Sequence, residues 1–197
     1  MRLRTPLSGE VVKSLKAGEI VHLDGVVYTG RDEVHSRALD MHEKGEKLPV
    51  DLKGAALYHC GPIVRKKDDR WVLVAAGPTT SARMNSLEPR FIEAFGIRAI
   101  IGKGGMSQPT IDAMKKCGCV YLAITGGAAV LAAGGVKRVV GVEWLDLGMP
   151  EALWILEADN LGPLIVGIDA HGNSLFKKVE EEVKRNLPLA RKRLGME

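Results

Sequence analysis

Residues 71–84 of the chain have the sequence Trp71-Val72-Leu73-Val74-Ala75-Ala76-Gly77-Pro78-Thr79-Thr80-Ser81-Ala82-Arg83-Met84. The apolar run at its start predicts a buried strand, and the Gly-Pro pair predicts a turn. The hydroxyl residues that follow are typical of a helix start, because their oxygens accept free backbone N–H groups there. The same order of apolar strand, glycine turn and capped helix recurs at Gly102 and Gly126. This alternation predicts an α/β domain with parallel strand pairs.

A helix that starts near Thr79 would carry Arg83 one turn further on, on the same face. The hydroxyl and the guanidinium would then converge at the carboxyl end of a strand, where open α/β sheets bind their ligands. The helix N-terminus also favours a bound anion. The alternative is an ordinary capped helix with a solvated arginine.

The rest of the chain continues the alternation. We expect a short edge strand at 11–12, strands at 20–28, 55–59, 99–101, 120–124, 139–145, 152–158 and 164–168, and a hairpin over 64–76, with helices at 33–44, 87–95, 107–116 and 175–186. Asp24-Gly25 indicates a hairpin or bulge in the first of the long strands. The early strands make the sheet mixed. We expect a single domain over 1–197, with 1–17 a peripheral lead-in and 187–197 an exposed tail.

Composition restricts the class of protein. Hydrophobic residues make up 46% of the chain, enough for a substantial core, and the formal net charge is only +4. Lysines and arginines are scattered among acids with no basic stripe, which argues against nucleic-acid binding. The start has no apolar signal core, and no apolar run reaches the roughly 18 residues that span a bilayer. Three cysteines form no disulfide framework, so we expect a soluble protein of a reducing cytoplasm.

Two further cations occupy glycine-containing turns. Lys103 lies in Gly102-Lys103-Gly104-Gly105, where glycines allow a ligand to approach the backbone, although the sequence is not a P-loop. Arg31 follows Gly30 at a predicted helix start, where a cation is unfavourable unless an anion lies beside it. The alternatives are a tight turn with an exposed Lys103 and an Arg31 paired with Asp32 or Glu33.

The cysteines do not form a cluster motif. Cys117 and Cys119 are separated by one residue, against the two typical of iron–sulfur ligands, and Cys60 is distant in the sequence. His35 and His42 are seven residues apart, and no zinc-protease pattern exists. We therefore predict no metal ligands in this chain.

The candidate residues together are Arg31, Thr79, Arg83 and Lys103, all at strand ends. Three cations and a hydroxyl suit a small dicarboxylate, because arginine binds carboxylates bidentately. The sequence offers no strong electrophile and no obvious acid–base pair. The pattern therefore indicates half of a site.

At this point the motifs resemble a known family, the β subunit or C-terminal domain of class I iron–sulfur fumarases and L-tartrate dehydratases. The matching stretches are Gly30-Arg31-Asp32-Glu33-Val34-His35, Gly61-Pro62, Gly77 to Met84, Gly102-Lys103-Gly104-Gly105-Met106 and Gly126-Gly127-Ala128-Ala129. The resemblance covers about residues 18–186. It implies a swivelling β/β/α fold.

The resemblance also implies a role for each candidate residue. Arg31, Arg83 and Lys103 would bind the substrate carboxylates, and Thr79 would lie near the carbon that loses its proton. Thr79 and Lys103 would be the catalytic residues, although Thr79 could instead position a water or a carboxylate. A separate α subunit would carry the four-iron–four-sulfur cluster, and this chain would bind none alone. We expect a hetero-oligomer that interconverts (S)-malate and fumarate.

Three other interpretations remain open at this point. L-tartrate dehydratases share the same motifs, so tartrate is an alternative substrate. A non-catalytic module for anion binding or assembly would need the same cations without the chemistry. A dinucleotide-binding domain is a weaker rival, because no G-x-G-x-x-G follows a strand.

Overall fold

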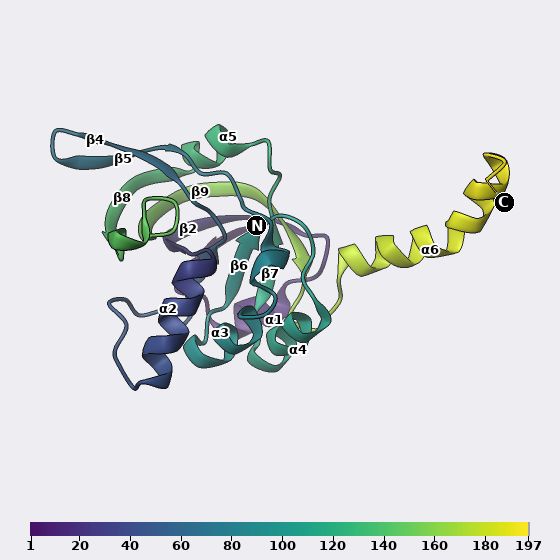
Figure 1. Cartoon of the computed structure of the whole chain (residues 1–197), viewed down its shortest axis with the longest axis horizontal. Coiled ribbons are helices and arrows are strands. Elements are labelled where there is room, and N and C mark those ends of the chain that lie inside the picture. The colour runs from purple at the N-terminus through teal and green to yellow at the C-terminus, as the bar shows by residue number, and fades with distance from the viewer. Residues whose placement is uncertain (197) are drawn as a thin grey trace.

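The computed structural model of the chain describes residues 1–196, whose strands and helices are shown in Figure 1. The strands are β1 (Arg2–Arg4), β2 (Ile20–Thr29), β3 (Ala56–Tyr58), β4 (Ile63–Lys67), β5 (Arg70–Ala75), β6 (Ala99–Gly102), β7 (Val120–Ala123), β8 (Val136–Glu143) and β9 (Leu153–Ile168). The helices are α1 (Gly9–Ser14), α2 (Asp32–Glu43), α3 (Glu88–Phe95), α4 (Gln108–Cys117), α5 (Ala129–Gly134) and α6 (Leu175–Arg193), with the 3₁₀ turns η1 (Ser81–Met84) and η2 (Leu145–Leu147).

Seven strands form one sheet in the order β1-β2-β3-β6-β7-β9-β8. β2, β3, β6 and β7 are parallel neighbours, whereas β9 runs antiparallel to β2, β7 and β8. Because β9 pairs with both β7 and β2, the sheet closes on itself into a barrel-like ring. β4 and β5 form a separate hairpin. The α/β fold with a mixed sheet, as expected from the sequence, is confirmed.

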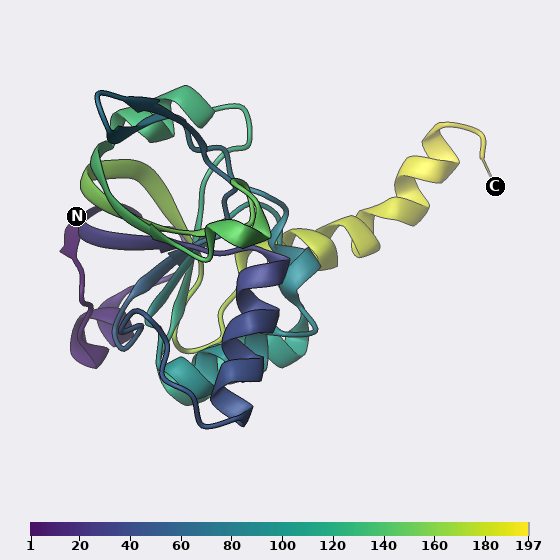
Figure 2. The ribbon, with the colours of Figure 1, turned by 60° about the vertical axis from the view of Figure 1, so that its left-hand side comes forward.

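The pleat of the parallel strands divides their side chains between two cores. In β6, Ala99 and Ile101 pack in an inner core with side chains of β2, β3, β7 and β9. Ile100, between them, packs in an outer core with Phe91 of α3 and Met114 of α4. Figure 2 shows α2, α3 and α4 gathered on one side of the strands. The helices therefore bury one face of the parallel strands and leave their carboxyl ends free to carry loops.

Residues 1–17 are part of the fold, and the expectation of a peripheral lead-in is wrong. β1 pairs in parallel with β2, and Leu3, Leu7 and Leu15 are buried in the inner core. Val11 and Val12, expected in an edge strand, lie in α1, which Ser8 caps by accepting a hydrogen bond from the Val11 amide. The first residues thus complete one wall of the inner core.

The segment from Trp71 to Met84 differs from its prediction. β5 belongs to the hairpin and is only half-buried, so it is not a strand of the main sheet. No helix starts at Thr79; the 3₁₀ turn η1 begins at Ser81, and the Thr80 side chain does not cap it. The reason is that the Thr79 and Ser81 amides already donate to the carbonyls of His59 (2.7 Å) and Lys103 (3.0 Å).

Other local predictions are confirmed. Asp24-Gly25 coincides with a register irregularity in the β2–β9 pairing, and Gly96 ends α3 in the left-handed conformation (φ 63°). Ser174 caps α6 by accepting from the Lys177 amide. The expected strand at 164–168 is the end of β9, which is 16 residues long.

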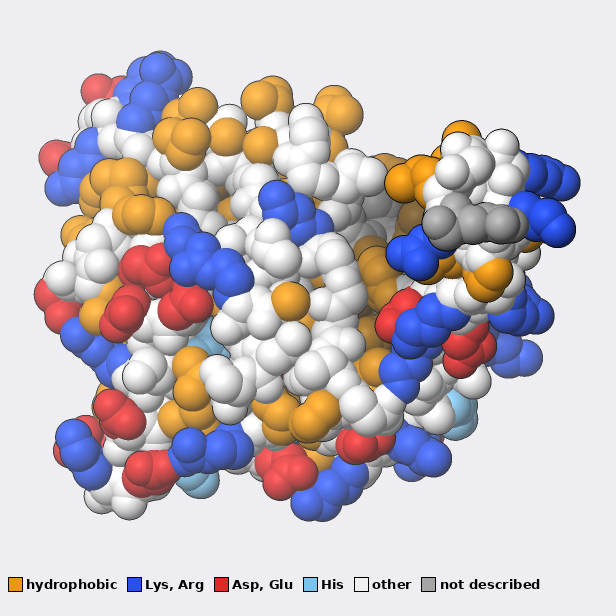
Figure 3. Space-filling model, turned by 45° about the vertical axis from the view of Figure 1, so that its right-hand side comes forward, with side chains coloured by type: hydrophobic (Ala, Val, Ile, Leu, Met, Phe, Trp, Pro, Cys, Tyr) orange, Lys and Arg blue, Asp and Glu red, His pale blue; other side chains and the backbone are white. Residues whose placement is uncertain are grey.

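Helix α6 extends away from the rest of the molecule (Figures 1 and 2) and continues through most of the expected tail. None of its residues is buried. Figure 3 shows lysine and arginine side chains mixed with hydrophobic ones on this helix. No helix within residues 1–196 is both long and apolar enough to cross a membrane.

Candidate active site

Four segments follow the carboxyl ends of β2, β3, β6 and β7 and lie along one edge of the sheet, because these strands are parallel neighbours. Arg31 follows β2, Gly61 follows β3, Lys103 follows β6 and Gly126 follows β7. We call these residues, with Thr79, the carboxyl edge. It is the position at which open α/β sheets bind ligands.

The segment of residues 78–81 crosses the carboxyl edge. Pro78 forms an antiparallel bridge with Cys60, and Thr80 forms a parallel bridge with Lys103. The amide of half-buried Thr79 donates to the His59 carbonyl at 2.7 Å. Backbone contacts therefore fix Thr79 between the ends of β3 and β6, with Arg31 on one side of it along the sheet and Lys103 on the other.

Arg31 is the N-cap residue of α2, in an extended conformation and without a side-chain cap. Its guanidinium pairs with Glu151 at 2.9 Å, not with Asp32 or Glu33. The side chain lies across Gly61, since a β-carbon at Gly61 would be 2.9 Å from the Arg31 Nη1. The Arg31 Nε is buried and has no hydrogen-bond partner within residues 1–196. One buried donor of the guanidinium is therefore unsatisfied in this structure.

Lys103 is half-buried and lies over the turn that follows β7. A β-carbon at Gly126 would be 3.4 Å from the Lys103 Nζ, so the absence of a side chain at Gly126 makes room for the ammonium group. Unlike Arg31 and Arg83, Lys103 forms no ion pair within the described part of the chain.

Arg83 extends from η1 toward the start of α2, where it pairs with Asp32 at 2.7 Å. Its side chain is 49% exposed. Asp32 and Glu151 thus neutralise two of the three cations that the sequence presented as unopposed. Of the three cations, Lys103 alone has no carboxylate partner within residues 1–196.

Beneath the carboxyl edge lies a buried group that the sequence analysis missed: His35, His59 and Glu88, all with 0% exposed side chains. The His35 Nε2 lies 3.0 Å from the Glu88 Oε2, and its Nδ1 lies 2.7 Å from the Arg31 carbonyl oxygen. The His59 Nε2 lies 2.9 Å from the same Glu88 oxygen, but too far off line for a hydrogen bond. Both imidazoles therefore share one carboxylate.

The three groups change each other's ionisation. Burial alone would raise the pKa of Glu88, but the two histidines outweigh it and lower this pKa to about 2. Burial would lower the pKa of His35, yet Glu88 and the Arg31 carbonyl raise it above 6.5. For His59, burial prevails over the attraction of Glu88, so its pKa falls below 6.5. These directions favour the carboxylate form of Glu88, the protonated form of His35 and the neutral form of His59.

Two hydroxyls extend this buried group. The His59 Nδ1 lies 2.9 Å from the Ser81 Oγ, and the Tyr121 hydroxyl donates to the same oxygen at 3.0 Å. Ser81 is the first residue of η1, and Tyr121 lies in β7. We call the five side chains of Tyr121, Ser81, His59, Glu88 and His35 the buried network.

Gly102, at the end of β6, leaves the space that the buried network occupies. A β-carbon there would lie 1.9 Å from the Ser81 Oγ and 3.1 Å from the Tyr121 hydroxyl. We expect Gly102→Ala to lower the free energy of unfolding by about 1–3 kcal/mol, the usual cost of overpacking.

Chemical denaturation measures this effect, with Gly127→Ala as the control, because a β-carbon at Gly127 meets nothing within 4 Å. Equal stability of the two variants would contradict the close packing of Ser81 beneath Gly102.

The cysteines are poorly suited to hold a metal cluster. Cys60 and Cys119 are buried and Cys117 is half-buried, and all three are free thiols. Burial raises the pKa of Cys60 to about 12 and raises that of Cys119 as well, which disfavours the thiolate that binds metals. Within residues 1–196, the one group of three side chains close enough to hold an ion is His35, His59 and Glu88, and it contains no cysteine.

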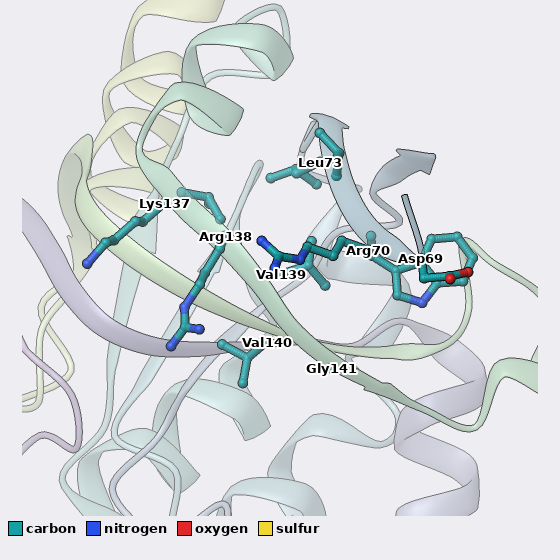
Figure 4. A pocket seen from close by; sticks show the side chains of 11 residues that line it. Asp69, Arg70, Leu73, Lys137, Arg138, Val139, Val140 and Gly141 are labelled. Carbon is teal, nitrogen blue, oxygen red and sulfur yellow. The ribbon is translucent and has the colours of Figure 1, made fainter. Parts of the chain in front are cut away.

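A groove of about 710 Å³ lies elsewhere, between the hairpin and β8 (Figure 4). In Figure 4, Arg70 extends from β5 toward β8, which carries Lys137 and Arg138. None of the four candidate residues lines this groove, and both Lys137 and Arg138 already pair with Glu157. The groove therefore does not belong to the carboxyl edge.

The sequence model of the family described as "Fumarase C-terminus" matches residues 1–179. The chain therefore belongs to this family, in agreement with the resemblance that its motifs indicated.

Named relatives agree with this assignment. The chain is 51% identical to the "Putative L(+)-tartrate dehydratase subunit beta" of Methanocaldococcus jannaschii, over 92% of this chain and 93% of that protein. It is 43% identical to the L(+)-tartrate dehydratase subunit beta of Escherichia coli K12, over 88% and 85% of the two chains. A "Putative fumarate hydratase class I" of Geobacillus stearothermophilus is 43% identical over 91% of this chain but only 34% of its own length.

Proposed function

We propose that this chain is the β subunit of an iron–sulfur hydro-lyase that interconverts (S)-malate and fumarate. It supplies carboxylate-binding residues to a site shared with a cluster-bearing α subunit. The observation that carries this proposal is the carboxyl edge, where Arg31, Thr79 and Lys103 follow or cross adjacent parallel strands. The names of the relatives, which are hydro-lyases, support the reaction class.

The cations of the carboxyl edge suit a substrate with two carboxylates. A guanidinium binds a carboxylate bidentately and fixes its orientation, which is the role we assign to Arg31 and Arg83. Lys103, which has no acidic partner in the described residues, binds the second carboxylate and stabilises the negative charge that develops as the C–H proton leaves. Thr79 lies between them and contacts that carbon or orients a water beside it.

The remaining chemistry comes from the partner in this proposal. An iron–sulfur cluster with an open iron would supply Lewis-acid activation of the substrate hydroxyl. Two thiols of this chain are buried and one is half-buried, and burial raises the pKa of each, which disfavours cluster binding and supports placing the cluster on the α subunit. This chain covers 34% of the length of the Geobacillus relative, which leaves room in that protein for a second part. Three free thiols also favour a reducing compartment such as the cytoplasm.

A second substrate has its own support. Both relatives of nearly equal length are named tartrate dehydratase subunits, so L(+)-tartrate is an alternative to malate and fumarate. Tartrate carries one hydroxyl group more than malate, and a site that hydrogen-bonds this hydroxyl can discriminate strongly between the two.

The purified chain is expected to be folded, colourless and inactive, because it lacks thiolates placed to bind a cluster. Iron and sulfide analysis and a hydro-lyase assay check this, on the chain alone and on its complex with the cluster-bearing subunit. The complex is assayed with (S)-malate, fumarate and L(+)-tartrate in parallel.

A stoichiometric cluster in the isolated chain would contradict the proposed division of labour. Binding of dicarboxylates by a complex that turns over none of the three would favour the non-catalytic module.

A further inference from the structure

The buried network connects three of the segments that form the carboxyl edge. The His35 Nδ1 contacts the Arg31 carbonyl, and the His59 carbonyl accepts from the Thr79 amide. Ser81, which contacts the His59 ring, donates its amide to the Lys103 carbonyl. Arg31, Thr79 and Lys103 are therefore each one contact away from a member of the network.

Donor and acceptor rules assign the protons of this network. The Arg31 carbonyl can only accept, so the His35 Nδ1 carries a hydrogen, and the carboxylate of Glu88 requires a second one on the His35 Nε2. His35 is therefore an imidazolium. Because Ser81 already accepts from Tyr121, we assign its own hydrogen to the His59 Nδ1; His59 is then neutral, with its hydrogen on the Nε2 that faces Glu88.

Stability alone does not explain this arrangement. A buried ion pair is often matched or exceeded in stability by apolar side chains of similar volume. The Glu88 Oε1 is buried and has no hydrogen-bond partner within residues 1–196, which costs further stability. The charged pair instead fixes geometry, because each of its directional hydrogen bonds holds one backbone segment in place relative to the next.

We infer that the buried network of Tyr121, Ser81, His59, Glu88 and His35 is a positioning device that holds Arg31, Thr79 and Lys103 in one fixed arrangement for dicarboxylate binding. These five are positioning residues that act through the backbone of the carboxyl edge. The kinetic part of this inference rests on the proposed function, whereas the proton assignment and the backbone coupling do not.

The first test uses the isolated full chain and needs no activity. Nitrogen-15 NMR of the imidazoles at pH 6.5 is expected to show His35 protonated on both nitrogens and His59 neutral with its proton on Nε2. A neutral His35, or one equivalent of Zn²⁺ retained by the purified chain, would overturn the assignment, because a metal would replace both Nε2 protons.

The second test measures amide exchange in Glu88→Gln. We expect the Thr79 and Ser81 amides to exchange about tenfold faster than in the wild type, because the shared anchor of both imidazoles is lost. Glu93→Gln is the matched control on α3, since the partly exposed Glu93 pairs only with Lys116 at the surface. Unchanged exchange at Thr79 and Ser81 in folded Glu88→Gln would overturn the coupling.

The third test uses Ser81→Ala, which keeps the ion pair of His35 and Glu88. It tests whether the buried network positions the candidate residues even if Glu88→Gln does not fold. In the complex with the cluster-bearing subunit, we expect Ser81→Ala to raise KM for the dicarboxylate about tenfold, the effect of one lost or misaligned contact. The exposed Ser86→Ala is the control in the same segment. A lower kcat with unchanged KM would contradict positioning, since a purely structural defect reduces only the amount of active enzyme. If the wild-type complex has no hydro-lyase activity, the proposed function fails. The NMR and exchange results still test the proton assignment and the backbone coupling of the network.

Discussion

Replacing Lys103 by Met is expected to lower kcat/KM of the assembled enzyme for its dicarboxylate by about 10²–10³-fold, the usual cost of removing one preorganised charge-stabilising group. Lys103 is the one candidate cation without a carboxylate partner in the described residues, so we expect its charge to act on the ligand. Methionine retains most of the volume over Gly126. Stability is therefore expected to change by no more than about 0.5 kcal/mol.

Steady-state kinetics of the complex and a thermal melt of the chain measure the two effects. Lys47→Met, at an exposed position in the loop after α2, is the control for loss of one positive charge. Similar kcat/KM values for the Lys103→Met and Lys47→Met complexes would remove Lys103 from the site.

The second large effect concerns Glu88. We expect Glu88→Gln to lower the free energy of unfolding by about 3–5 kcal/mol at mildly acidic pH, the typical cost of breaking a buried ion pair. The carboxylate is fully buried and contacts two imidazoles at 2.9 and 3.0 Å. Burial alone would raise the pKa of Glu88, but the two imidazoles lower it to about 2, the direction expected for a carboxylate that stabilises the folded state.

The pH dependence follows from the direction of each pKa. The lowered pKa of Glu88 gives stability that is present above pH 4.5 and lost as the pH falls toward 2. The raised pKa of His35 gives stability that is present below pH 6.5 and lost as the pH rises through its folded value. Burial, the largest influence on the pKa of His59, lowers it in both proteins, so we expect the contribution of His59 to largely cancel from the difference between them.

We therefore expect the stability difference between the wild type and Glu88→Gln to be large at about pH 5.5 and clearly smaller at about pH 9. Urea denaturation at both pH values measures it, with Glu93→Gln as the surface control. A difference that does not depend on pH would show that His35 is not the charged partner of Glu88. The negative charge of nearby Asp32 acts on both imidazoles in the wild type and the variant alike.

Much of the fold could be predicted because apolar runs and glycine turns are local signals. β6, β7 and the left-handed Gly96 at the end of α3 follow from them directly. The closure of the sheet could not be predicted, since β9 pairs with β2, a strand more than 100 residues away in the sequence. Residues 1–17 were misjudged because Leu3, Leu7, Val12 and Leu15 follow neither a helical nor a strand period over a long enough stretch.

In the candidate site, too, residues in local motifs could be predicted, whereas residues brought together only by the fold could not. The motifs placed Arg31 and Lys103 at strand ends, and the parallel register brings those ends to one edge. The hydroxyls of residues 79–81 suggested a helix cap, but neighbouring strand ends bind the amides of Thr79 and Ser81 instead. The buried network combines residues 35, 59, 81, 88 and 121, which no local pattern connects. Its one local signal was the spacing of Arg31 and His35 within the first turns of α2.

The central claim is that the carboxyl edge is half of a site completed by the cluster-bearing subunit. The most direct test is the affinity between the two subunits, measured by titration with and without (S)-malate or L(+)-tartrate. A ligand held by both halves must tighten their association, so we expect a lower Kd with one of these dicarboxylates for the wild type and little change for Lys103→Met. A wild-type affinity that neither dicarboxylate changes would contradict the shared site.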